Sequence, residues 1–270
     1  MFGLLLFCTG YYITAGISVV IGYHRGLTHK AFKLNKTLER ILVTLALPAG
    51  TPVQWVGNHR AHHQHSDTNL DPHSPVVSGF WYAHNGWLID SSNPFICSLY
   101  ALAGPFRFLI DAWNRPRTNQ QHVHLANDIA QDAYYRLLSM HYVYLTILLF
   151  HIIIPFGFVY SLWQWTGIIA LWATLVLIFN AGDSVDSFAH LYGDKPYKNE
   201  SGARNNKTLA LLTFGDGWHA DHHQFPRSAK LGFHNNLDVS WHIILLLQKL
   251  GLASELQKPS AEQIKSQLKQ

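Results

Sequence analysis

Two long stretches without a charged residue constrain this chain more than any other feature. Residues 2–22 contain no Asp, Glu, Lys or Arg over 21 positions, and residues 137–182 contain none over 46. A helix that crosses the ~30 Å hydrocarbon core of a membrane needs about 20 apolar residues. The stretches therefore predict an integral membrane protein. The alternative is that they are core helices of a large soluble protein, since an apolar content of 48% also suits a globular chain.

The longer stretch must turn back on itself, because at ~1.5 Å per helical residue it is about twice the length of one crossing. Pro155 and Gly157 provide a break, and Trp163 and Trp165 are an aromatic pair of the kind enriched at membrane interfaces. The first stretch lacks the basic start and the cleavage site of a signal peptide, so we expect it to stay attached. Three spans are predicted, at about residues 2–22, 137–158 and 166–188.

The basic residues predict the orientation of these spans. Of the 20 Lys and Arg residues, ten lie from Arg25 to Arg136 and ten follow Gly193. The positive-inside rule then places residues 23–136 and 189–270 in the cytoplasm and the N-terminus outside. Topology and anionic lipid headgroups account for the net charge of +4. No aromatic-plus-basic pattern is present, so no nucleic acid is expected as a partner.

The cytoplasmic regions contain shorter apolar pieces at residues 38–50 and 95–110, which we expect to be interfacial helices. An amphipathic helix is also expected near residues 241–252. Cys8 and Cys97 support neither a disulfide framework nor an iron–sulfur site. The predicted fold is all-α, with a single domain over residues 1–270 that consists of membrane helices and a cytoplasmic helical cap.

Histidines are grouped in three short patterns in the predicted cytoplasmic cap. The patterns are HxxxxH (His24, His29), HxxHH (His59, His62, His63) and HxxHH again (His219, His222, His223). On a helix, the first histidine of HxxHH is a neighbour of both later ones, while the adjacent pair diverges by ~100°. One such box can therefore serve two metal ions. In HxxxxH the two side chains diverge unless the helix loosens, so we expect the helix to end inside this box.

Isolated histidines are usually ordinary hydrogen-bonded residues, and we assign that role to His65, His73, His84, His122, His124, His141, His151, His234 and His242. The eight box histidines are different. A structural zinc site is complete with four ligands, so eight imidazoles indicate two ions and a catalytic task. Imidazole suits zinc, copper, iron and nickel alike, and the residues alone do not distinguish iron from zinc.

The three boxes resemble those of the integral-membrane fatty acid desaturases of the stearoyl-CoA type, here as HRGLTH, HRAHH and HADHH. The likeness extends to ITAG before the first box, SDTNLDPHS, GFWYAHNGWL, AHLYGDKPY and GDGWHADHHQFP, in family order from about residue 12 to 252. The resemblance implies a diiron centre with His190 as a ninth ligand, although zinc can replace iron in a purified form. It also implies O2-dependent removal of two hydrogens from a long acyl chain, with Trp55 shaping the acyl tunnel.

Electrons must come from a separate carrier, because no dinucleotide, haem or iron–sulfur module is recognisable in the sequence. The resemblance implies a ferredoxin or a cytochrome b5. The acyl substrate implied is carried by CoA, by acyl-carrier protein or by a membrane lipid.

Three departures from the family pattern bear on function. Asp186 stands where the family commonly has Asn, and it is a candidate for a direct or water-mediated metal contact or for a structural role. The text GWLIDSSNP lacks the basic residues that meet CoA phosphates in the animal enzymes, which favours acyl-carrier protein or a membrane lipid as the acyl donor. The first of the family's usual four spans is missing, so either the chain begins late or three spans suffice.

Two alternatives to a desaturase follow. A relative with the same diiron chemistry could hydroxylate, acetylenate or decarboxylate an acyl chain. A non-catalytic metal-binding or transport protein is the other, although His141 and His151 in the spans do not form an ion path.

Overall fold

The computed structural model describes residues 1–233 and 236–269, and it is built mostly of helices. Among these residues the only sheet pairs β1 (Lys33–Leu34) with β2 (Ala253–Ser254), antiparallel. Two helices, Phe2–Thr28 and His141–Leu191, are long and apolar enough to cross a membrane, by length and composition. The helical class and the apolar spanning segments agree with the prediction from the uncharged stretches.

The first long helix changes its winding halfway along. α1 (Phe2–Ile17) continues without a break into η1 (Ser18–Thr28), which is a π-helix. The helix is therefore longer than the predicted span of residues 2–22. Only Leu4 of α1 is buried, whereas nearly all of η1 is buried in the helical body. The apolar end thus lies outside the body and the histidine-bearing end lies within it.

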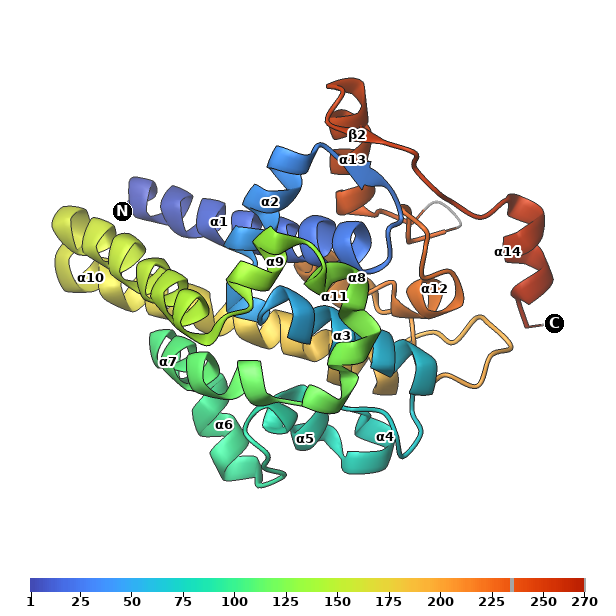
Figure 1. Cartoon of the computed structure of the whole chain (residues 1–270), viewed down its shortest axis with the longest axis horizontal. Helices are drawn as coiled ribbons and strands as arrows, with labels where there is room; N and C mark the ends of the chain where they lie inside the picture. Colours follow the sequence, from blue (N-terminus) through green and yellow to red (C-terminus); the bar gives the residue numbers. More distant parts are fainter. Residues whose placement is uncertain (234–235, 270) are drawn as a thin grey trace.

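The second long helix, α10 (His141–Leu191), doubles back at Gln164, where the backbone has φ 52° and ψ −139° (Figure 1). Its two arms pack closely, because a Cβ on Gly167 would lie 2.5 Å from the carbonyl oxygen of Val159. The turn lies between the predicted spans of residues 137–158 and 166–188, but Pro155 and Gly157, which were expected to break the helix, both lie inside the first arm. A proline in an apolar helix removes only one backbone hydrogen bond, which neighbouring helices can accommodate.

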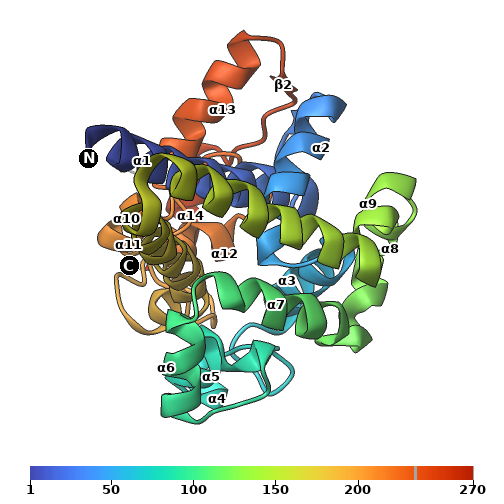
Figure 2. The ribbon, with the colours of Figure 1, turned by 90° about the vertical axis from the view of Figure 1, so that its left-hand side faces the viewer.

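The remaining helices form the body from which α1 and α10 project, and Figure 2 looks at the side on which they project. The first part of the body contains α2 (Lys36–Leu45), η2 (Leu47–Ala49), α3 (Pro52–His65), α4 (Pro75–Ser78), α5 (Phe80–His84), η3 (Gly86–Leu88), α6 (Pro94–Leu102) and α7 (Pro105–Asn114). The rest contains η4 (Arg115–Arg117), η5 (Gln120–Ala126), α8 (Asn127–Ala130), α9 (Ala133–Leu138), α11 (Lys207–Leu212), α12 (His219–Gln224), α13 (Val239–Lys249) and α14 (Ala261–Gln267).

These elements lie where short helices were expected, but one of the expected helices is divided into two. α2 with η2 occupies the apolar piece 38–50, and α13 lies at the predicted C-terminal helix. The piece 95–110 is two helices, α6 and α7, bent by 117°.

The main hydrophobic core joins η1, α2, α3, α7, α9 and α10. Tyr23 of η1, Val56 of α3 and Leu175 of α10 belong to one cluster of buried side chains. The Tyr23 hydroxyl also donates a hydrogen bond to the carbonyl oxygen of Gly50, at 2.8 Å, just before α3. This packing holds the inner end of η1 and the inner end of α10 against the helix that carries the second histidine box.

Candidate metal centre

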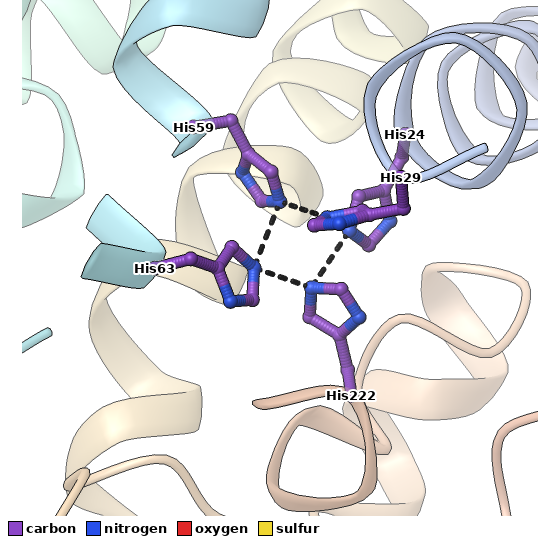
Figure 3. Close-up of side chains that lie close together, drawn as sticks. All are labelled: His24, His29, His59, His63 and His222. Atoms are coloured by element: carbon purple, nitrogen blue, oxygen red, sulfur yellow. Dashed lines mark hydrogen bonds between the residues drawn. The ribbon is translucent and has the colours of Figure 1, made fainter. Parts of the chain in front are cut away.

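Nine histidines from four separate segments converge in the helical body. Their nitrogen atoms form two groups, and within each group the atoms lie within 4.8 Å of one another. The first group contains His24, His29, His59, His63 and His222 (Figure 3). The second group contains His62, His190, His219 and His223. The eight box histidines and His190 are therefore all brought together.

The π-helix explains how His24 and His29 join the same group. A π-helix bonds each N–H to the carbonyl five residues earlier, and the N–H of His29 bonds the carbonyl of His24 at 3.2 Å. Residues five apart are thereby aligned, and the two ring centroids lie 5.0 Å apart. The helix both loosens and ends in this box, because η1 stops at Thr28 and His29 is its C-cap.

The two HxxHH boxes each contribute to both groups. On α3, His59 and His63 lie one turn apart and enter the first group, while His62 enters the second. On α12 the division is reversed: His222 enters the first group, and His219 and His223 enter the second. The divergence of adjacent side chains on a helix produces this division, as the box spacing predicts.

The Nε2 atoms of each group face one another at short range. In the first group, His63 Nε2 lies 2.7 Å from His222 Nε2 and 3.1 Å from His59 Nε2. In the second group, His219 Nε2 lies 2.9 Å from His190 Nε2 and 3.0 Å from His223 Nε2. An imidazole uses the lone pair of this atom to bind a metal. Both groups therefore present converging metal-ligand atoms.

Three buried carboxylates hold the opposite ring nitrogen of their histidines. His24 Nδ1 donates to Asp216 at 2.8 Å, His62 Nδ1 donates to Asp71 at 2.9 Å, and His190 Nδ1 donates to Asp67 at 2.9 Å. A carboxylate on one nitrogen fixes the tautomer and leaves the lone pair on the other nitrogen, as is usual around metal-bound histidine.

These three aspartates were not among the site residues predicted from the sequence. Only their closeness to the boxes could have indicated them: Asp67 and Asp71 follow the second box, and Asp216 precedes the third box by three residues. Burial opposes ionisation of Asp67, but the hydrogen bond from His190 outweighs it and lowers the pKa of this carboxyl group to about 2. Asp67 is therefore an anion at neutral pH.

Five of the box histidines are held in the neutral form. Burial, followed by the neighbouring imidazoles, lowers the pKa of His59, His63, His219, His222 and His223 well below the usual value. Neutral imidazole is the form that binds metals. So many converging neutral nitrogens, with carboxylates behind three of them, fit two cations of the first transition series.

An apolar cavity runs from the first group into the body. Its walls come from α1 and η1, the end of α2, η2, α3, η3, the second arm of α10 and residues 212–216, and it reaches His24 and His59. Its empty space, including the open part, is about 1110 Å³. Trp55 lines the cavity and stacks on the His59 ring at 4.9 Å. Asp186 also lines the cavity and belongs to neither histidine group.

Two of the isolated histidines have particular surroundings. His73 stacks on His62 at 4.5 Å and forms a third close set with His62 and Asp71. His84 joins α5 to α10 through Ser187, at 2.9 Å, and Asn180, at 3.1 Å. His234 lies outside the described residues.

Comparison with known proteins identifies the chain. The model of the fatty acid desaturase family matches residues 2–254. The chain belongs to the fatty acid desaturase family. The desaturase is 35% identical to an acyl-CoA C20 Delta5-desaturase of Anemone leveillei over 258 residues, which are 94% of this chain and 73% of the relative.

Two further relatives act on lipid-bound chains according to their names. The desaturase is 33% identical to an sn-1 stearoyl-lipid 9-desaturase of Anabaena variabilis, over 94% of this chain and 83% of that protein. It is 32% identical to Delta-9 acyl-lipid desaturase 1 of Arabidopsis thaliana, over 93% of this chain and 74% of that protein. The desaturase is thus an oxidoreductase that acts on acyl chains in lipid biosynthesis, as its sequence motifs predict.

Proposed function

We propose that this desaturase introduces a cis double bond into a long acyl chain, with O2 as cosubstrate and two iron ions held by the nine histidines. The observation that supports this most is the contact of the apolar cavity with His24 and His59. An acyl chain in this cavity would lie beside the first group of ligands. The second group would hold the other ion, and its four histidines do not line the cavity.

The residues fit such ions. His24, His29, His59, His63 and His222 would hold one, and His62, His190, His219 and His223 the other. When bound, the two irons would supply the activation of O2 that removal of two hydrogens requires. Zinc would fit the same imidazoles and is expected where the purified protein has lost iron.

The chain's own residues would fix the substrate and exclude water. Apolar side chains such as Val19, Ile178 and Phe179 line the cavity and would pack on the methylenes. Trp55 would set the path of the acyl chain, because its ring lines the cavity and stacks on His59. Asp186 would hold a water molecule near the metal centre, since it lines the same cavity.

We further propose that the chain is one domain whose body, with all nine histidines, lies on the cytoplasmic side. This proposal rests on the basic residues, all of which belong to residues 25–136 and 195–269. Electrons would then arrive from a cytoplasmic carrier of the ferredoxin or cytochrome b5 type.

We propose a membrane lipid as the acyl donor, in preference to acyl-CoA or acyl-carrier protein. No Lys or Arg lies between Arg60 and Arg107, a range that includes the whole segment after Trp87. The phosphates of CoA would therefore meet no cation from this segment. The relatives include both an acyl-CoA desaturase and acyl-lipid desaturases by name, so the choice rests on the lack of cations in this segment.

Product analysis tests the proposal. The purified enzyme in lipid, with a reducing system and O2, should yield a cis double bond in the lipid's own acyl chains. Replacing His222 by Ala should abolish product, while replacing the exposed His124 by Ala should not. A hydroxyl group, a triple bond or a shortened hydrocarbon as the main product would instead support the hydroxylase, acetylenase or decarboxylase alternative.

A further inference from the structure

The bent pair α6–α7, which we call the elbow, buries its charged side chains and exposes its large apolar ones. On α7, Arg107 is 0% exposed and Asp111 is 1% exposed. The large side chains on the outer face, by contrast, are 37% to 64% exposed: Phe106, Leu109, Ile110 and Trp113. α6 adds an outer face of the same kind, with Phe95, Ile96, Leu99 and Leu102. A helix in water shows the opposite arrangement.

Each buried charge of the elbow has an oppositely charged partner. Arg107 makes two hydrogen bonds to Asp183 of α10, at 2.6 and 2.9 Å. Asp111 lies 3.3 Å from the Nε atom of Arg115 and accepts a hydrogen bond from the hydroxyl of Tyr100. Two cations and two anions thus balance on the inner face. Charged residues within a membrane are arranged in this way, facing protein and paired with one another.

The backbone at the bend is also satisfied by protein. The helix break at Ala103 and Gly104 exposes carbonyl groups at the end of α6, which hydrocarbon could not solvate. The side chain of Trp172 donates to the carbonyl of Leu102 at 3.1 Å, and that of Asn180 donates to the carbonyl of Ala101 at 3.0 Å. Both donors come from α10, so the bend does not depend on water.

The outer face of the elbow continues that of the long helix. The ring of Phe106 meets the ring of Trp172 of α10 at 5.3 Å. At ~1.5 Å per residue, α6 and α7 are about 13 and 15 Å long, which is about half of the hydrocarbon thickness. Polar residues return at both ends, with Asp90 before α6 and Arg117 after α7, where the guanidinium lies 4.0 Å above the Trp113 ring. Such an Arg–Trp pair suits the membrane interface.

We propose that the elbow is a re-entrant element immersed in the bilayer, whose outer face is covered by lipid acyl chains. Because Asp183 lines the cavity and pairs with Arg107, the elbow would fix one wall of that cavity at the depth of the membrane hydrocarbon. The proposal rests on the membrane placement of α1 and α10 but not on the metal chemistry. It gives a bilayer lipid, the proposed acyl donor, direct contact with the element beside the substrate cavity.

Site-directed spin labelling of the full chain in phosphatidylcholine vesicles tests this. Single cysteines at Leu99, Phe106 and Leu109, with Cys8 and Cys97 replaced by Ala, would carry the label. Controls are Ile154, on the outer face of the first arm of α10, and the exposed Gln121. Access to O2 and to a water-soluble nickel chelate is then measured at each site.

We expect the O2-to-nickel accessibility ratio at the three elbow sites to equal that at Ile154 and to exceed that at Gln121. Nickel access at the elbow equal to that at Gln121 would overturn the proposal. Protection from both reagents would also overturn it, because the face would then be covered by a second copy of the chain or another protein. Nickel access at Ile154 would instead contradict the membrane placement on which the proposed function depends.

Discussion

His62 and His63 are consecutive in the sequence, yet their imidazoles lie in different ligand groups. His62 Nε2 is 3.1 Å from His223 Nε2, whereas His63 Nε2 is 2.7 Å from His222 Nε2. Adjacent residues on α3 diverge by ~100°, and α12 repeats the arrangement in the opposite order. Two short helices therefore supply ligands to two ions, which makes the two sites separable by mutation.

Replacing either histidine singly should remove one metal site and leave the other. We expect His62→Ala and His63→Ala each to bind about one metal ion per chain instead of two, because each deletes a ligand from one group only. The double variant His63→Ala/His222→Ala should bind the same amount as His63→Ala, since both residues belong to the first group. Metal analysis after reconstitution measures this. Equal and complete metal loss in both single variants would show that the groups do not act separately.

Asp71→Asn should weaken the second metal site. Asp71 accepts a hydrogen bond from His62 Nδ1 and from the backbone N–H of Asp67, at 2.8 Å, so it fixes both the ring and the following loop. Loss of such a carboxylate costs about 10- to 100-fold in metal affinity or activity. Titration of the metal-free protein gives the affinity, and Asp90→Asn, at an exposed position, is the control. A metal affinity equal to that of the control would show that Asp71 does not support the second metal site.

Asp186 should affect turnover and not metal content. It lines the cavity but lies in neither ligand group, so Asp186→Ala should lower the rate of product formation while both metals remain bound. Asp186→Asn should restore activity, because an amide oxygen can still accept a hydrogen bond from water. Rates and metal content are measured on the same samples. Loss of metal in Asp186→Ala would make this residue a ligand.

Gly104 should be required for the bend between α6 and α7. It has φ 53° and ψ −122°, and a Cβ there would lie 2.5 Å from the Nε1 atom of Trp172. Gly104→Ala should therefore destabilise the protein by roughly 1–3 kcal/mol. Gly157→Ala is the matched control, because it lies inside a helix with nothing within 4 Å. Thermal unfolding in detergent should show a lower Tm for Gly104→Ala only. A Tm equal to that of the control would mean that the bend tolerates a side chain.

Much of the candidate site was predictable because it depends on short spacings. The HxxHH pattern determines which imidazoles share a helix face, and the uncharged stretches indicated where apolar helices lie. The chain-wide resemblance added His190, which no spacing connects to the boxes. The family match and the desaturase relatives confirm the predicted enzyme class.

Other features depend on packing between distant residues and were missed. A turn between the second and third predicted spans was expected, but Pro155 and Gly157 do not form it. The turn is at Gln164, where the backbone takes a positive φ that no motif marks. We predicted α7 as part of an interfacial helix, because nothing in the sequence around its charged residues indicates that they are buried. Only the position of Asp183, 76 residues after Arg107, shows that they point inward.

Quantitative metal analysis of enzyme purified without oxygen tests whether the nine histidines hold a diiron centre. We expect about two iron ions per chain, bound through imidazole nitrogen, with cis-unsaturated product formed on addition of O2 and reductant. Iron reconstitution should restore activity to a preparation that contains zinc. A single metal ion per chain, or two exchangeable zinc ions with no oxygen consumption after iron reconstitution, would contradict the account.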